Sequence, residues 1–304
     1  MKSDVDPLAY AKRPDAVSLA VVVCHLAFVF CPIYLAAAMG PRALLIPLWL
    51  WFGLTMHGLL NLMHECAHYH VFHPRWGSDV LGRWVLAPLM LADFDNYRQL
   101  HWAHHRELGG ASDPKYSYKV DIRGRKLLTF FLRCVTGAEA LKKFGYQNAQ
   151  RAGAKLSSSH FWIVRVVIVQ SLFATSLLIT AWWFGAGQMK SALVGAMTAY
   201  ITVYLYGLAS LTLFIATLRS IAEHQHAADG CAVSGGAALR NLACGPIERL
   251  IFGCYGFAEH ATHHFKPAIP SYHLAEATKE LGVVDATMIP DLTYRKMLMQ
   301  AQLH

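Results

Sequence analysis

The chain has 304 residues, of which 55% are hydrophobic and only 15% charged, and its mean hydropathy is +0.32. Soluble domains carry closer to about a quarter charged residues, so the composition argues against a water-soluble globule. It also excludes disorder, which needs low hydrophobicity and high net charge. The seven cysteines form an odd set without a CxxC pair, so they favour neither a disulfide framework nor a zinc ribbon.

Four stretches are long and apolar enough to cross a bilayer, which takes about 20 residues of helix. They cover residues 16–39, 43–63, 161–184 and 191–218. A shorter apolar run at 80–92 cannot span, and we expect it to form an interfacial or re-entrant helix. The pattern predicts an all-α integral membrane protein whose four transmembrane helices form two hairpins.

Lysine and arginine placement predicts how these helices are oriented. Of the 27 basic residues, 24 fall before the first span, between the second and third, or after the fourth. Positively charged loops stay in the cytoplasm, so both termini are expected there. We expect a cytoplasmic helical cap made of residues 64–160 and 219–304, and one membrane-embedded domain over residues 1–304. The orientation rule then explains the net charge of +8 without a nucleic-acid partner.

Histidine is the unusual residue type, with 17 copies. Three clusters stand out: HECAH at residues 64–68, HWAHH at 101–105 and HATHH at 260–264. Residues i, i+3 and i+4 share one face of a helix, so each cluster is expected to point its imidazoles in one direction. His224 lies one turn beyond the fourth span; His226 competes with it, but two residues apart on a helix they cannot both face one site.

Nine histidines are therefore candidate metal ligands on one side of the membrane: His64, His68, His101, His104, His105, His224, His260, His263 and His264. This number is too large for one zinc ion, which takes three or four protein ligands. It suits two metal ions with open positions. Imidazole binds Fe, Zn, Cu and Ni alike, so the ligands alone do not name the metal.

The three clusters, their order and their relation to the spans resemble the histidine boxes of the membrane fatty acid desaturase and hydroxylase family. Asp113-Pro114 after the second cluster and the segment Phe265-Lys266-Pro267-Ala268-Ile269-Pro270 after the third add to the resemblance. His224 matches the family's additional histidine. Some members have an Asn four residues earlier, where this chain has Ser220.

The resemblance implies a non-haem di-iron centre held by the nine histidines, with dioxygen as co-substrate. It implies an enzyme that introduces a double bond into the acyl chain of a fatty acid or lipid, or alternatively a hydroxylase that uses the same site. Neither a haem-binding HPGG nor a GxGxxG nucleotide motif is present in the sequence, so electrons are expected from a separate ferredoxin, rubredoxin or cytochrome b5. The lack of a fused electron-transfer domain favours a bacterial inner membrane.

Ligating histidines usually donate their second N–H to a carboxylate or carbonyl. Acidic residues near the clusters are candidates for this role: Glu65, Asp95, Asp113, Glu223 and Glu259. HECAH also satisfies HExxH, the zinc protease signature, in which Glu65 would be the general base. An intramembrane zinc protease is therefore a remote alternative, but it would leave both HxxHH clusters without a role.

Overall fold

The computed structural model describes residues 10, 12–40, 44–153, 161–185, 187–224, 239–280, 293–296 and 299. Every regular element within these residues is helical, and an isolated β-bridge joins His224 to Leu239. Four helices are long and apolar enough to cross a membrane. They are α1 (Asp15–Met39), α2 (Leu45–Ala67), α8 (Phe161–Phe184) and a continuous segment Met189–Glu223. The predicted all-α class with four spans is confirmed.

The fourth span is helical throughout but contains two π-helical turns. It consists of α9 (Met189–Thr198), η5 (Ala199–Leu205), η6 (Leu208–Thr212) and α10 (Leu213–Glu223). Two predicted boundaries were wrong. The second span continues from residue 63 to Ala67, so HECAH begins on its last turn, and the fourth continues from residue 218 to Glu223. In both cases polar residues extend the helix, because protein covers them and they do not face lipid.

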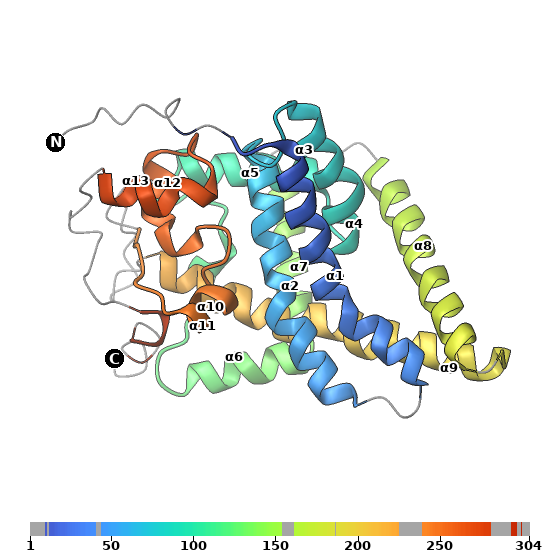
Figure 1. Ribbon diagram of the computed structural model, residues 1–304. Coiled ribbons are helices and arrows are strands. Elements are labelled where there is room, and N and C mark those ends of the chain that lie inside the picture. Colours follow the sequence, from blue (N-terminus) through green and yellow to red (C-terminus); the bar gives the residue numbers. More distant parts are fainter. Residues whose placement is uncertain are drawn as a thin grey trace.

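The shorter elements lie between or after these spans. They are α3 (Arg75–Leu81), η3 (Gly82–Leu86), α4 (Ala87–Leu89), α5 (Phe94–Arg106), η4 (Tyr116–Lys119), α6 (Lys126–Val135), α7 (Ala138–Gly153), α11 (Pro246–Ile251), η8 (Phe257–Glu259), α12 (His260–Phe265), η9 (Ser271–His273) and α13 (Leu274–Glu280). Figure 1 shows α5, α12 and α13 near the start of α1, at one end of the bundle. The long helices thus carry at one end the elements that contain the histidine clusters.

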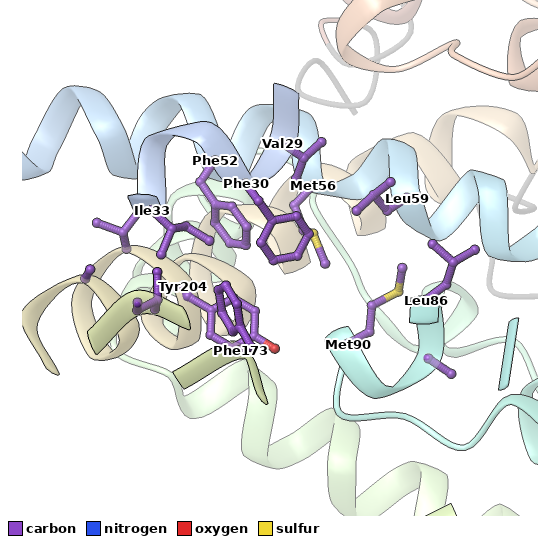
Figure 2. Close-up of a cluster of buried hydrophobic side chains, with 14 of the residues drawn as sticks. Val29, Phe30, Ile33, Phe52, Met56, Leu59, Leu86, Met90, Phe173 and Tyr204 are labelled. Carbon is purple, nitrogen blue, oxygen red and sulfur yellow. The ribbon is translucent and has the colours of Figure 1, made fainter. Parts of the chain in front are cut away.

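The largest cluster of buried side chains lies between the spans and joins all four. Figure 2 shows Phe30 of α1, Phe52 of α2, Phe173 of α8 and Tyr204 of η5 packed together. The Phe30 and Phe173 rings meet edge to face at 5.3 Å, and those of Phe173 and Tyr204 at 5.1 Å. Such contacts between large aromatic rings hold transmembrane helices together inside a bilayer, where the hydrophobic effect does not drive helices to associate.

The run predicted at 80–92 is helical over η3 and α4, and it packs against α8. Where α4 ends, its carbonyl groups have no partner within the helix. Gln170 of α8 donates to the Pro88 carbonyl at 2.8 Å, and the Tyr204 hydroxyl donates to the Leu89 carbonyl at 2.8 Å. These bonds satisfy a helix end among the spans, where water does not.

Candidate metal centre

The structure brings all nine predicted histidines together in two neighbouring groups. Group one consists of five imidazoles whose ligand atoms all lie within 4.8 Å of one another: His64, His68, His101, His105 and His263. Group two consists of four that meet the same limit: His104, His224, His260 and His264. His226 lies outside the described residues, so its competition with His224 is not tested.

Each HxxHH cluster contributes to both groups, which corrects the expectation that a cluster points in a single direction. In α5, His101 and His105 belong to group one and His104 to group two. In α12, His260 and His264 belong to group two and His263 to group one. Successive residues turn by about 100° around a helix, so i and i+4 lie nearer in direction than i+3 and i+4.

The two groups touch each other. The rings of His105 and His264 stack at 4.1 Å, with 20° between their planes. Phe257 of η8 lies at 4.8 Å from the ring of His64 and stacks on that of His260 at 5.4 Å. Its ring therefore contacts both groups. Phe257 was not predicted from the sequence, because one Phe beside a cluster is not a pattern.

Hydrogen bonds fix the tautomers of several of these histidines. Nδ1 of His64 donates to Glu65 at 3.1 Å, and Nδ1 of His104 donates to Asp113 at 2.8 Å. His224 uses Nδ1 to donate to the Ser220 carbonyl at 2.8 Å. In each ring Nε2 is left with its lone pair, the atom needed to bind a metal ion. The Ser220 hydroxyl contacts the Ser117 hydroxyl at 3.0 Å.

The five acidic candidates divide into those that contact a clustered histidine and those that do not. Glu65 and Asp113 do so directly, and Glu223 lies 3.9 Å from Nδ1 of His260. Asp95 instead pairs with Arg83 at 2.8 Å, and Glu259 pairs with Arg249 at 2.7 Å. The last two therefore have structural partners among the arginines.

Burial keeps seven of these imidazoles neutral. It lowers the pKa of His104 to about 4 and that of His105 to about 2. Burial and repulsion between the rings hold five further pKa values well below the ordinary value, those of His68, His101, His260, His263 and His264. Since a metal ion binds the neutral ring, the cluster is in the ligand-competent state at neutral pH.

A cation fits this donor set. Nε2 of His104 and Nε2 of His224 lie 3.2 Å apart, and both carry lone pairs, so neither can donate to the other. The Lys115 amino group lies at 3.3 Å from the first and 3.0 Å from the second, and burial lowers its pKa to about 7. In group one, Nε2 of His64 and both ring nitrogens of His263 are buried without a hydrogen-bond partner. Nitrogen donors without protein partners suit a site built for metal ions.

Comparison with known proteins identifies the family. The family model "Fatty acid desaturase" matches residues 41–287, which is most of the chain. The chain belongs to the fatty acid desaturase family. It is 27% identical over 270 residues to the sn-1 oleoyl-lipid 12-desaturase of Synechocystis sp. (strain ATCC 27184 / PCC 6803 / Kazusa), covering 83% of this chain and 72% of the relative. A protein of the same name from Picosynechococcus sp. (strain ATCC 27264 / PCC 7002 / PR-6) is 30% identical over 103 residues, 34% of this chain and 27% of the relative.

As a member of this family the protein is a membrane-bound oxidoreductase. The hydrogen bonds of Glu65 oppose the zinc protease alternative. One Glu65 oxygen accepts from Nδ1 of His64 at 3.1 Å. The other accepts from Nδ1 of His70 at 3.2 Å and from the Ser271 amide at 3.0 Å. The carboxylate therefore lies on the side of His64 opposite Nε2, away from where a metal-bound water would need a general base.

Proposed function

We propose that this desaturase-family protein introduces a double bond into the acyl chain of a membrane lipid, using two iron ions and dioxygen. The observation that carries the proposal is the pair of adjacent histidine groups at one end of four apolar helices. The names of the two relatives, both lipid desaturases, support a lipid-linked acyl substrate and desaturation.

In this proposal each histidine group holds one iron ion. Two bound iron ions would supply the reduction of dioxygen that makes an unactivated C–H bond reactive, which side chains alone cannot do. Glu65 and Asp113 hold His64 and His104 through Nδ1, so that Nε2 of each ring would be the atom that binds a metal ion. Phe257 and Trp102 pack against the rings, with Trp102 at 4.8 Å from His68, and limit the access of water.

The apolar helices would place the acyl chain. Exposed side chains of α8, such as Leu172 and Ile179, are suited to contact with lipid tails. A chain held among the spans could present a methylene to the metal centre above it. How deep it enters would then select the carbon attacked.

Hydroxylation at the same site is the second candidate. Both reactions would use the same histidines and differ in whether oxygen is returned to the substrate. The relatives' names favour desaturation, and the products separate the two: one has lost two hydrogen atoms, and the other has gained an oxygen atom.

We further propose that residues 1–304 form one domain with both termini in the cytoplasm of a bacterial cell, the site facing the same side. The concentration of lysine and arginine outside the short connections supports this orientation. Electrons would come from a separate one-electron carrier of the ferredoxin, rubredoxin or cytochrome b5 type.

The proposal is tested by lipid analysis of bacterial cells that express the protein. Wild type should produce a new unsaturated acyl chain, and His104→Ala should not, although it inserts into the membrane normally. His73→Ala is the matched control, because His73 is half exposed and contacts Asp15 and none of the clustered histidines. Full activity of His104→Ala would contradict the proposal, and a hydroxylated product would replace it with the second candidate.

A further inference from the structure

Helix α6 has more apolar surface than the rest of the protein covers. The rings of its Phe130 and Phe131 pack against Phe214 of the fourth span, at 5.5 and 5.1 Å. Successive residues turn by about 100° around a helix, so Leu128 and Leu132 share a face that adjoins Phe131. That second face is open, since Leu128 is 61% exposed and Leu132 is 51% exposed. The helix therefore presents one apolar side to the fourth span and another to its surroundings.

Helix α7 has the same property. Leu141 is 75% exposed and Phe144 is 62% exposed, and residues three apart lie on one face of a helix. Side chains of α8 that we expect to contact lipid tails are exposed to a similar degree, with Leu172 at 66% and Ile179 at 59%. Large apolar side chains with this exposure mark a surface that meets lipid or another protein.

The position of α6 favours lipid as the material that covers this surface. The helix packs against η6 and α10, and Phe214 belongs to the hydrophobic stretch at residues 191–218. Figure 1 shows α6 beside the fourth span, closer than α5 and α12 to the end of the bundle where α1 ends and α2 begins. Helix α6 therefore adjoins the apolar surface of a span and does not cover the histidine clusters.

The segment that contains α6 is basic. Residues 121–143 contain six basic and two acidic residues, and both acidic residues have partners within the segment. Asp121 pairs with Arg123 at 2.9 Å, and Glu139 pairs with Arg133 at 2.9 Å. A helix with a wide apolar face and basic residues on its polar side is typical of a membrane interface, where anionic headgroups attract its charge. The charge of the segment thus favours an anionic bilayer surface as its partner.

We propose that α6 and α7 are attached to the bilayer surface. Leu128 and Leu132 lie among the acyl chains of anionic lipids, and the basic residues of the segment contact the phosphate groups of these lipids. This part of the predicted cytoplasmic cap is then bound to the membrane. The inference is independent of the metal ions proposed above.

Attachment of this helix pair also supports the segment that follows the second histidine cluster. Tyr116 of η4 donates to Glu139 of α7 at 2.6 Å, and the Tyr146 hydroxyl donates to the Pro114 carbonyl at 3.3 Å. Pro114 directly follows Asp113, whose carboxylate accepts a hydrogen bond from one of the clustered histidines. Through α7, the bilayer surface thus steadies the backbone that positions Asp113.

The test is photo-crosslinking of the protein in nanodiscs that contain equal amounts of phosphatidylglycerol, which is anionic, and phosphatidylcholine. Leu132→p-benzoylphenylalanine places a photoreactive group on the open face of α6. It should form lipid adducts, detected by mass spectrometry, in a yield within about threefold of the same replacement at Leu172 of α8. The same replacement at Glu107, which is exposed and contacts Ser112, is the matched control and should give at least about tenfold fewer lipid adducts.

The preference for anionic lipid is measured in the same experiment. Phosphatidylglycerol adducts at residue 132 should outnumber phosphatidylcholine adducts by about twofold or more, and replacing Arg125 and Lys126 together by Gln should remove this excess. Lys190→Gln, at the start of α9, is the control for a lost positive charge and should leave the excess unchanged.

Two results would overturn the attachment to lipid: a lipid yield at residue 132 no greater than at residue 107, or a crosslink to a second copy of the chain in place of lipid. Equal adducts of the two lipids would overturn the role of the basic residues. Leu128→p-benzoylphenylalanine repeats the measurement on the same face if the first variant does not fold. None of these readouts depends on metal content or activity, so failure of this inference and failure of the proposed function are distinguishable.

Discussion

Asp113 and His104 form a fully enclosed pair: Nδ1 of the histidine lies 2.8 and 2.9 Å from the two carboxylate oxygens, and the side chain of Asp113 is 0% exposed. Burial alone would raise the pKa of Asp113, but the hydrogen bonds from His104 and from the Gly109 and Lys115 amides hold it below its ordinary value. The carboxylate therefore stays ionised and acts on group two through the orientation and basicity of His104.

Asp113→Asn should weaken metal binding at group two by about 10- to 100-fold, the usual effect of removing a carboxylate behind a ligating histidine. The amide keeps the shape of the side chain but loses its charge. Metal content after dialysis at low free iron checks this. Glu107→Gln, at an exposed contact with Ser112, should retain wild-type metal content. Equal metal retention in the two variants would show that Asp113 is not needed to hold the metal.

Glu65→Gln should weaken group one in the same way, because an amide cannot accept from His64, His70 and the Ser271 amide together. Glu259→Gln is the comparison: Glu259 pairs with Arg249 and contacts no clustered histidine, so metal content should be nearly unchanged. Iron analysis of both variants decides the matter. Loss of metal from Glu259→Gln but not from Glu65→Gln would reverse these assignments.

Gly53→Ala should destabilise the packing of the spans. A Cβ at residue 53 would lie 2.6 Å from Cβ of Leu211 in η6, so α2 and the fourth span would have to separate. Overpacking of this kind costs about 1–3 kcal/mol. Gly145→Ala, in a helix with open space around the added atom, should be neutral or slightly stabilising. Thermal unfolding in detergent measures both, and equal midpoints would argue against the close contact.

Reduction by an acidic electron carrier should slow as ionic strength rises. Most basic residues lie on the proposed cytoplasmic side, and salt shortens the range of their attraction from about 10 Å at 0.1 M to about 3 Å at 1 M. The rate of reduction by ferredoxin at several salt concentrations tests this, with dithionite, which needs no docking surface, as the control for the site itself. A rate independent of salt would argue against docking on a basic face.

Eight of the nine histidines were found from sequence because a helical spacing repeated three times is a pattern that few other structures produce. His224 was found from its place after the fourth span and its match to the family's additional histidine. Their division into five and four was not, since it depends on how α5 and α12 are rotated relative to α2. The relevant rotation is set by contacts such as that of His105 with His264, which join residues far apart in the chain.

The four spans were also predicted, but the residues at which the second and fourth spans end were not. The hydrophobic stretches end at Met63 and Leu218, whereas the helices continue through His64 and Glu223, which are buried. Helical hydrogen bonding continues wherever protein covers the backbone, and the sequence alone does not reveal that cover. Lys115 was missed for a similar reason, because a single lysine after Asp113-Pro114 looks like any other loop residue.

The measurement that tests the central claim most directly is the metal content of the purified chain, prepared anaerobically with iron supplied. Two iron ions per chain in wild type, with both lost when His104 and His64 are replaced together by Ala, is the predicted result. A single zinc ion per chain that survives the double replacement would contradict a di-iron centre at these histidines.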